Sequence, residues 1–410
     1  MTDSEDRPSV NFGALLWHAI FLALASNFMD VDTIIPAMLI NAGGGEIHLG
    51  LMTAIMLGGS TFLQLIFAGF ISHRPRKRKF LLLGINLRIA ALFALSALFF
   101  YSDLLAEGLL IILIFVFISQ FSFSGAFANI SYVDIVGKSL HGAARRAFLS
   151  AKQIVFSIGI FISAVAVRQL LVLFQFPGNY ALLFLLAGGL LLTASLGFWR
   201  LKETPTRGRE RTSLLKFFAM IPEAMKSDRN LKFYLLLINS LGLGLSVLPF
   251  LIYLAKESFG ISGSIIGNFL LLKTIGMLSA GFFLLKFSRR FKYRYLLLVS
   301  MSLAAAIPIA ALALQGLPRV YPFIFIFSGI FMATYKTAIE GILLDISTDD
   351  NRATYAGISG AGNILTTVFP LSAGFLIKGT GYSPVFVGVS LLVLASVVFA
   401  IKIDCQKETD

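Results

Sequence analysis

A few ionisable or amide side chains interrupt long apolar stretches of this sequence, and they are its candidates for chemistry. A carboxylate in such a place can take up and release a proton, and an ammonium group can hold an anion. A charge near the centre of a lipid bilayer costs about 3 kcal/mol or more, so each one is a functional candidate or half of a buried pair. The candidates for binding and coupling are Asn27, Asp30, Lys152, Gln153, Lys273, Lys336 and Glu340.

Two aspartates share the first apolar stretch, and their spacing separates them. On a regular helix Asn27 and Asp30 share a face, whereas Asp32 lies about 200° from Asp30. Only one aspartate should then face a central cavity, and we favour Asp30; the alternative is that Asp30 pairs with a neighbouring helix. Pro36 removes the backbone hydrogen bond to the carbonyl of Asp32, so a bend is expected there.

The cations within apolar stretches leave more alternatives open. Lys336 and Glu340 are four residues apart on a predicted helix and could neutralise each other. Lys273 has no charged neighbour on its own predicted helix, so it either faces water and a bound solute or pairs with another helix. For Arg88 we predict a structural role, with its side chain reaching the interface or bonding to a neighbouring helix.

The elements that position these residues are predicted to be membrane-spanning helices. Of the 410 residues, 57% are hydrophobic and only 13% are charged, against about 25% charged in soluble domains. Several apolar runs exceed the roughly 20 residues that cross a bilayer. We predict twelve spans, near residues 12–40, 49–71, 80–101, 108–135, 147–172, 179–200, 232–255, 263–286, 294–316, 320–346, 353–378 and 382–402.

The net charge of +13 reflects topology rather than nucleic-acid binding. Lys and Arg gather in short connectors such as residues 73–79 and 286–294, and they form no continuous basic face. Basic connectors alternate with nearly uncharged or acidic ones, which the positive-inside rule assigns to the cytoplasm and the exterior. The sequence thus predicts a multi-pass protein of the cell (inner or plasma) membrane with both termini in the cytoplasm.

Metal, cofactor and enzyme signatures are not found in the sequence. The single cysteine, Cys405, excludes an intramolecular disulfide, and the four histidines lack ligand spacing. The phosphate-loop, dinucleotide and zinc-protease patterns are missing. We therefore expect neither a metal nor a cofactor, and no enzymatic activity.

One long polar segment divides the chain. We predict an N-terminal half over residues 1–200, a cytoplasmic linker with an amphipathic helix over 201–231, and a C-terminal half over 232–410. The two halves have matching residues in the same order: Pro36 corresponds to Pro249, and Asp134-Ile135 corresponds to Asp345-Ile346. A repeat of six spans is the sequence signature of one transporter architecture.

With these features, the chain resembles the major facilitator superfamily over essentially its whole length. The family's motif between spans two and three is matched by Gly69, Ile71, Arg74, Lys77, Arg78 and Lys79. His73 stands where the family usually has the Asp that caps a neighbouring helix in the cytoplasmic latch. The resemblance implies an all-α membrane protein of 12 transmembrane helices, arranged as two six-helix bundles related by pseudo-twofold symmetry.

The resemblance also implies where the candidates lie. Spans one, four, seven and ten of this family line the cavity, with spans two, five, eight and eleven beside them, so the binding candidates could reach the pathway. Charged residues at the cytoplasmic helix ends are expected to form gate pairs that break and reform. These gate candidates are Asp134, Arg145, Arg146, Arg290, Asp345 and Arg352.

The function predicted from these features is secondary active transport. We expect a monomer that moves a small organic solute, with a slight lean to an anionic or amphiphilic one, by alternating access and with protons as the coupling ion. One alternative is a proton-driven exporter of cationic or neutral drugs. Another, of a different class, is a non-transporting membrane receptor or assembly factor on the same scaffold. The expected partners are the solute and the lipid bilayer, without nucleic acid.

Overall fold

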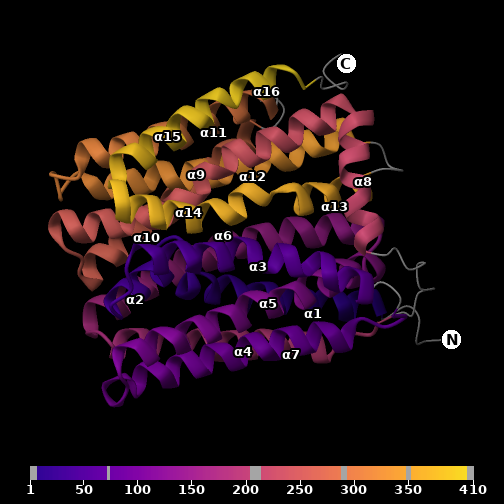
Figure 1. Ribbon diagram of the computed structural model, residues 1–410. Coiled ribbons are helices and arrows are strands. Elements are labelled where there is room, and N and C mark those ends of the chain that lie inside the picture. Colours follow the sequence, from indigo (N-terminus) through magenta and orange to yellow (C-terminus); the bar gives the residue numbers. More distant parts are fainter. Residues whose placement is uncertain (1–6, 72–73, 204–213, 288–292, 348–351, 404–410) are drawn as a thin grey trace. The chain divides into compact units, whose positions relative to one another are not determined.

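The computed structural model describes residues 7–71, 74–203, 214–287, 293–347 and 352–403, which are helical and contain no β-strand (Figure 1). The α-helices are α1 (Arg7–Ser26), α2 (Ile34–Asn41), α3 (Glu46–Ile71), α4 (Arg78–Phe100), α5 (Glu107–Ser139), α6 (Gly142–Leu173), α7 (Gly178–Trp199), α8 (Leu214–Ser227), α9 (Arg229–Phe259), α10 (Gly263–Phe287), α11 (Tyr293–Leu314), α12 (Ile324–Ile346), α13 (Arg352–Gly362), α14 (Ile364–Thr380), α15 (Tyr382–Ala395) and α16 (Val397–Ile401). Three 3-10 helices are η1 (Asn27–Met29), η2 (Ser102–Leu104) and η3 (Tyr321–Phe323).

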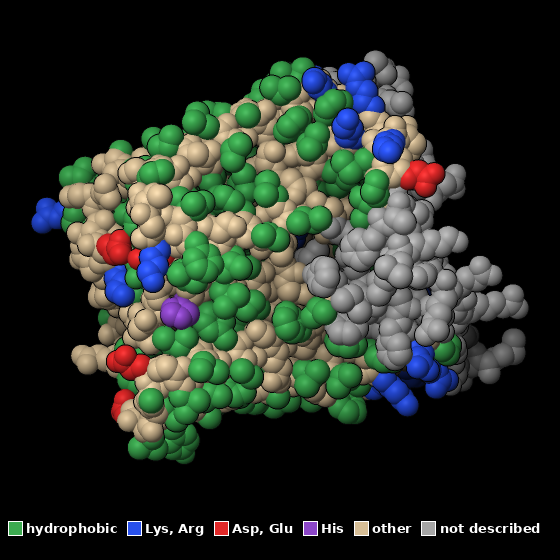
Figure 2. Space-filling view, in the orientation of Figure 1, with side chains coloured by type: hydrophobic (Ala, Val, Ile, Leu, Met, Phe, Trp, Pro, Cys, Tyr) green, Lys and Arg blue, Asp and Glu red, His purple; other side chains and the backbone are tan. Residues whose placement is uncertain are grey.

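Most of these helices have the length and composition of membrane spans. Within the described residues, 11 segments are long and apolar enough to cross a bilayer, and the apolar stretch Glu46–Gly59 of α3 is shorter. Hydrophobic side chains predominate on the face shown in Figure 2, as expected where lipid is the solvent. The prediction of an all-α membrane protein with about twelve spans is confirmed.

The helices form two compact units. Unit 1 comprises Met1–Asp30, Asn41–Gly43 and Gly59–Leu214, and unit 2 comprises Val31–Ile40, Gly44–Gly58 and Leu215–Asp410. The two aspartates of the first apolar stretch thus belong to different units. A helix, α8, is present in the predicted linker, while the predicted division at residues 201–231 stays a prediction.

The first span is not the single helix that the sequence predicts. It is interrupted between Ser26 and Ile34, where Asp30 has extended backbone angles (φ −62°, ψ 124°). Short polar side chains such as Asp30, Asp32 and Thr33 compete with the helical backbone for hydrogen bonds, which explains the break. Pro36 lies in the first turn of α2, where a missing N–H is tolerated, so it begins a helix instead of bending one.

The eleventh span is also broken, at Asn363 between α13 and α14. Asn239 of α9 satisfies the backbone groups that the break releases. Its Nδ2 donates to the carbonyl of Gly362 (2.7 Å), and its Oδ1 accepts from the N–H of Leu365 (2.8 Å). A broken helix at membrane depth requires such internal partners because lipid offers none.

In unit 2, α10 and α12 approach closely enough for their backbones to touch. A Cβ added at Gly329 would lie 2.0 Å from the carbonyl oxygen of Lys273, and one at Gly276 would lie 2.0 Å from the carbonyl of Ile326. Glycines at such contacts let membrane helices pack at short range. The middle of α10, including Lys273, is therefore held against α12.

Gly329→Ala is expected to lower the free energy of unfolding by about 1–3 kcal/mol, because the added methyl forces α10 and α12 apart. The matched control is Gly388→Ala in α15, where a Cβ would meet nothing within 4 Å. There the change should be neutral or slightly stabilising, since alanine favours helix. Thermal unfolding of purified protein measures both; equal melting temperatures for the two variants would contradict the close contact.

Candidate functional site

The candidate functional site is a buried ion pair in unit 2. The Nζ of Lys273 lies 2.5 Å from Oδ2 of Asp32, and their side chains are 3% and 10% exposed, respectively. Lys273 comes from the middle of α10, and Asp32 comes from the non-helical segment just before α2. Two opposite charges in distant parts of the sequence thus meet inside the unit.

The arrangement keeps both charges at membrane depth. Each ion would cost several kcal/mol to desolvate alone, and close pairing offsets much of that cost. Breaking the pair therefore requires a replacement partner for each ion, such as a proton on the carboxylate and an anion at the ammonium. A site of this kind can exchange one pair of partners for another.

The sequence predicted that only one of the two aspartates faces a cavity and favoured Asp30, whereas the structure pairs Asp32 with a candidate cation. Asp30 lies at the end of η1, is partly buried, and donates its N–H to the carbonyl of Asn27 (3.4 Å). The argument that separated the two aspartates assumed a regular helix through this segment, and that helix is absent. The sequence signal for the pair was the cluster of short polar residues before Pro36.

Asn27 secures the break of the first span within unit 1. Its Nδ2 donates to the carbonyl of Ile160 (2.6 Å), and its backbone N–H donates to Oγ of Ser163 (3.3 Å), both in α6. The side chain is buried. Asn27 thereby positions the segment that contains Asp30.

The other predicted binding residues lie on α6 and α12. Lys152 is partly buried, with its Nζ 5.2 Å from the ring centroid of Tyr132, and Gln153 is exposed. Lys336 and Glu340 are both exposed on α12. Among the predicted set, the structure gives Lys273 the most enclosed position, and the others stay predictions.

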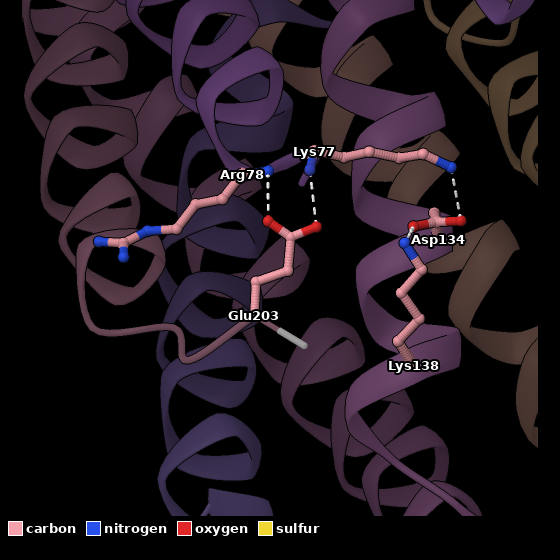
Figure 3. A network of polar contacts seen from close by, with 5 residues as sticks. All are labelled: Lys77, Arg78, Asp134, Lys138 and Glu203. Carbon is pink, nitrogen blue, oxygen red and sulfur yellow. Dashed lines mark hydrogen bonds and ion pairs between the residues drawn. The ribbon is translucent and has the colours of Figure 1, made fainter. Parts of the chain in front are cut away.

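The predicted gate residue Asp134 belongs to a network at one end of unit 1, shown in Figure 3. Its Oδ1 is 2.7 Å from Nζ of Lys77, and its Oδ2 pairs with Lys138 one turn along α5. Glu203, which follows α7, accepts hydrogen bonds from the backbone N–H groups of Lys77 (2.6 Å) and Arg78 (2.9 Å). Glu203 thus caps α4, whose own N-cap residue, Lys77, has no side-chain acceptor.

Glu203→Ala is expected to cost about 1–3 kcal/mol of unfolding free energy, because two charge-assisted hydrogen bonds to the start of α4 are lost. Glu203→Gln should cost less, since one side-chain acceptor remains. Glu223→Ala, on an exposed position of α8, serves as the control. Thermal unfolding measures all three; a loss for Glu223→Ala as large as for Glu203→Ala would argue against capping.

The remaining gate candidates are only partly described. Arg145 caps the end of α5 by donating to the carbonyls of Leu140 (2.9 Å) and Gly137 (2.6 Å). Arg146 is exposed, and Asp345 is partly buried near the end of α12. Arg290, the side chain of Arg352 and the motif residue His73 lie outside the described residues.

Comparison with known proteins agrees with the family resemblance that the sequence suggests. Residues 233–404 match the family model described as Major Facilitator Superfamily. Nearly the whole chain also matches a solved bacterial homologue of the human lysosomal transporter Spinster, in an inward-facing and unoccupied conformation. That match has a TM-score of 0.58 and 14% identity, and it covers 98% of this chain and 95% of that chain. The resemblance to the major facilitator superfamily is thus confirmed over residues 233–404.

Further solved transporters match the chain's fold at similar coverage. A POT family transporter in complex with 5-aminolevulinic acid gives a TM-score of 0.69 at 13% identity, covering 96% of each chain. Another, in complex with a thioalcohol-conjugated peptide, gives 0.67 at 13% identity and the same coverage. No curated protein sequence matches this chain. The family match over residues 233–404 and the 11 apolar helices among the described residues indicate a multi-pass membrane protein.

Proposed function

We propose that this superfamily member is a secondary active transporter that moves a small anionic organic solute together with a proton by alternating access. The observation that supports this most is the buried pair of Asp32 and Lys273. The superfamily fold supports the transporter class. One solved relative of that fold holds 5-aminolevulinic acid, so an organic acid is compatible with such a scaffold.

The proposed coupling follows from the charge of the site in each state. The pair itself consists of one carboxylate and one ammonium and is neutral. When a proton neutralises Asp32 and an acidic group of the solute binds Lys273, the loaded site is neutral again. Binding of the proton alone or of the anion alone changes the net charge of the pair by one unit. Such a change is costly at membrane depth. Proton and anion therefore bind cooperatively, and the neutral states are the ones that reorient.

The other predicted residues take supporting roles in this proposal. Asp30 is a second candidate for proton binding, and Lys152, Gln153, Lys336 and Glu340 are candidates for contacts to the solute. Asp134 and the arginines at the helix ends are candidates for the cytoplasmic gate. We place the protein as a monomer in the cell membrane with both termini in the cytoplasm, following the alternating basic connectors.

Uptake by reconstituted protein tests the proposed function. Purified protein in liposomes is given radiolabelled organic acids with an inwardly directed proton gradient, and each acid is compared with its neutral amide. The expected result is gradient-dependent accumulation of at least one acid above protein-free liposomes, abolished by a protonophore. Uptake restricted to cationic or neutral compounds would instead support a drug exporter, and proton-independent uptake would remove the coupling.

A further inference from the structure

Arg88 occupies the centre of the buried face of α4. The buried residues of this face lie three, four or seven positions away, on both sides of Arg88: Leu81, Gly84, Ile85, Leu92 and Leu95. The exposed side of the helix is marked by Leu83, Asn86, Ala90 and Ala97. Arg88 is therefore directed into unit 1 and away from the lipid, in the middle of a 23-residue helix. Of the two structural roles predicted from the sequence, a side chain that reaches the interface does not fit this position, whereas contact with a neighbouring helix does.

The guanidinium of Arg88 lies against an aromatic ring, and its Nε has no polar partner among the described residues. Its Cζ lies 4.0 Å from the ring centroid of Phe121 in α5. Its Nε is buried, and among the described residues it has no acceptor for its N–H. Nor is Arg88 part of an ion pair within the described part of the chain. Arg88 is partly buried, and an enclosed donor such as its Nε that lacks both kinds of partner is expensive to keep.

The surroundings of Arg88 add positive charge instead of compensating it. Two ring systems, His18 of α1 and Tyr132 of α5, lie 6.0 Å apart, and Lys152 of α6 lies over Tyr132 at 5.2 Å. Arg88 and Lys152 are the charged groups whose fields reach His18. In the same unit, the carboxylate of Asp134 is engaged by two lysines. This part of unit 1 therefore brings at least two cations, Arg88 and Lys152, close to aromatic rings.

A structural role does not explain this arrangement. A cation–π contact recovers only part of the desolvation cost of a buried guanidinium, and a methionine of similar length would pack on Phe121 without that cost. The planar guanidinium fork matches a carboxylate through two parallel hydrogen bonds. We infer that Arg88 is a ligand-binding residue, which holds the carboxylate of an organic acid whose apolar body contacts the aromatic side chains around it.

This inference deepens the proposed function, and its meaning for transport rests on that proposal. The binding itself does not require a gradient and is tested separately. A lipid headgroup presents related anionic chemistry, but the depth of Arg88 in the middle of its helix favours a solute. The experiment below separates the two sources.

Thermal-shift titration of the purified full-length protein in neutral detergent tests the binding. The probes are benzoate and 4-phenylbutyrate, each compared with its amide. A ligand that binds only the native state raises the melting temperature with concentration, which yields a Kd. At least one carboxylate should bind the wild type, and its amide should not. In Arg88→Met the carboxylate should bind about tenfold or more weakly, while the ligand-free melting temperature should be unchanged or higher, because a buried unpaired charge has been removed.

Lys79→Met is the matched control, because it removes a cation from an exposed position in the first turn of the same helix. It should leave the Kd unchanged. If Arg88→Met does not fold, Arg88→Lys is tested instead, since it keeps the charge and loses the planar fork. Wild-type affinity of Arg88→Lys for the carboxylate would overturn the assignment. The assignment is also overturned if neither carboxylate raises the melting temperature of the wild type, or if Arg88→Met keeps the wild-type shift. Stabilisation by phosphatidylglycerol in nanodiscs but by neither carboxylate would overturn a solute site. Arg88-dependent binding without gradient-driven uptake would keep this inference and remove the proposed function.

Discussion

Asp32→Asn is expected to abolish proton-driven accumulation while leaving exchange of the solute across the membrane at a measurable rate. The amide keeps the size of the side chain but cannot bind and release a proton in the working pH range. The variant site is then permanently like the protonated site, so the anion can bind Lys273 without a coupled proton. Accumulation in liposomes with a proton gradient measures the first effect, and counterflow of labelled against unlabelled solute measures the second.

Two comparison variants sharpen this test. Lys273→Met should lose both accumulation and exchange. In this variant the anion has no ammonium group to bind, so it cannot take the place of Asp32 as the partner of residue 273. Asp30→Asn lies two residues away and changes the same chemical group, so it distinguishes the two aspartates. If Asp30→Asn loses accumulation and Asp32→Asn keeps it, the coupling carboxylate is Asp30, as the sequence alone suggested. Wild-type accumulation in both asparagine variants would refute a carboxylate in this segment as the coupling group.

The membrane-spanning architecture could be predicted from the sequence because each apolar run must satisfy its backbone internally, and length alone then indicates a helix. The breaks were not predictable by the same rule. The segment from Asn27 to Thr33 is short and flanked by apolar residues. Hydropathy averaged over the length of a span therefore does not detect the break. At Asn363, the break depends on Asn239 of α9, a residue more than a hundred positions away.

The candidate site was predictable in its residue types but not in its pairing. Lys273 stands out in the sequence because a lysine in mid-span has no local partner. Whether it pairs with Asp30 or Asp32 depends on the local path of a non-helical segment, which helical periodicity cannot give. Arg88 was similarly visible as a charge in an apolar run. Its direction into unit 1 became clear only from the packing of α4 on α5.

The capped end of α4 shows a further limit of pattern matching. The motif residue Lys77 and the gate candidate Asp134 were each identified from the sequence, and the structure joins them. Glu203 was not identified, although it accepts two backbone hydrogen bonds at the start of α4. It lies in the segment that the sequence assigned to a linker, and only the return of the chain after α7 brings it to α4.

The second large effect is expected in the stability of the buried pair, because removing one partner leaves the other charge in an apolar environment. Lys273→Met and Asp32→Asn should each lower the free energy of unfolding by about 3–5 kcal/mol. The double variant Asp32→Asn/Lys273→Met should lose clearly less than the sum, since neither charge is then left buried.

A double-mutant cycle on the purified protein measures this coupling by chemical denaturation in mixed micelles. The interaction between the two positions should amount to about 2 kcal/mol or more in the cycle, beyond the range that independent sites show. Lys336→Met, which removes an exposed lysine from α12, provides the matched control and should change stability by less than about 0.5 kcal/mol. Strict additivity of the two single variants would mean that Asp32 and Lys273 do not stabilise each other. The proposed replacement of the Asp32–Lys273 contact by a proton on Asp32 and an anion on Lys273 would then have no energetic basis. A strong coupling together with intact folding of the double variant would instead show that the pair is dispensable for the fold and available for binding.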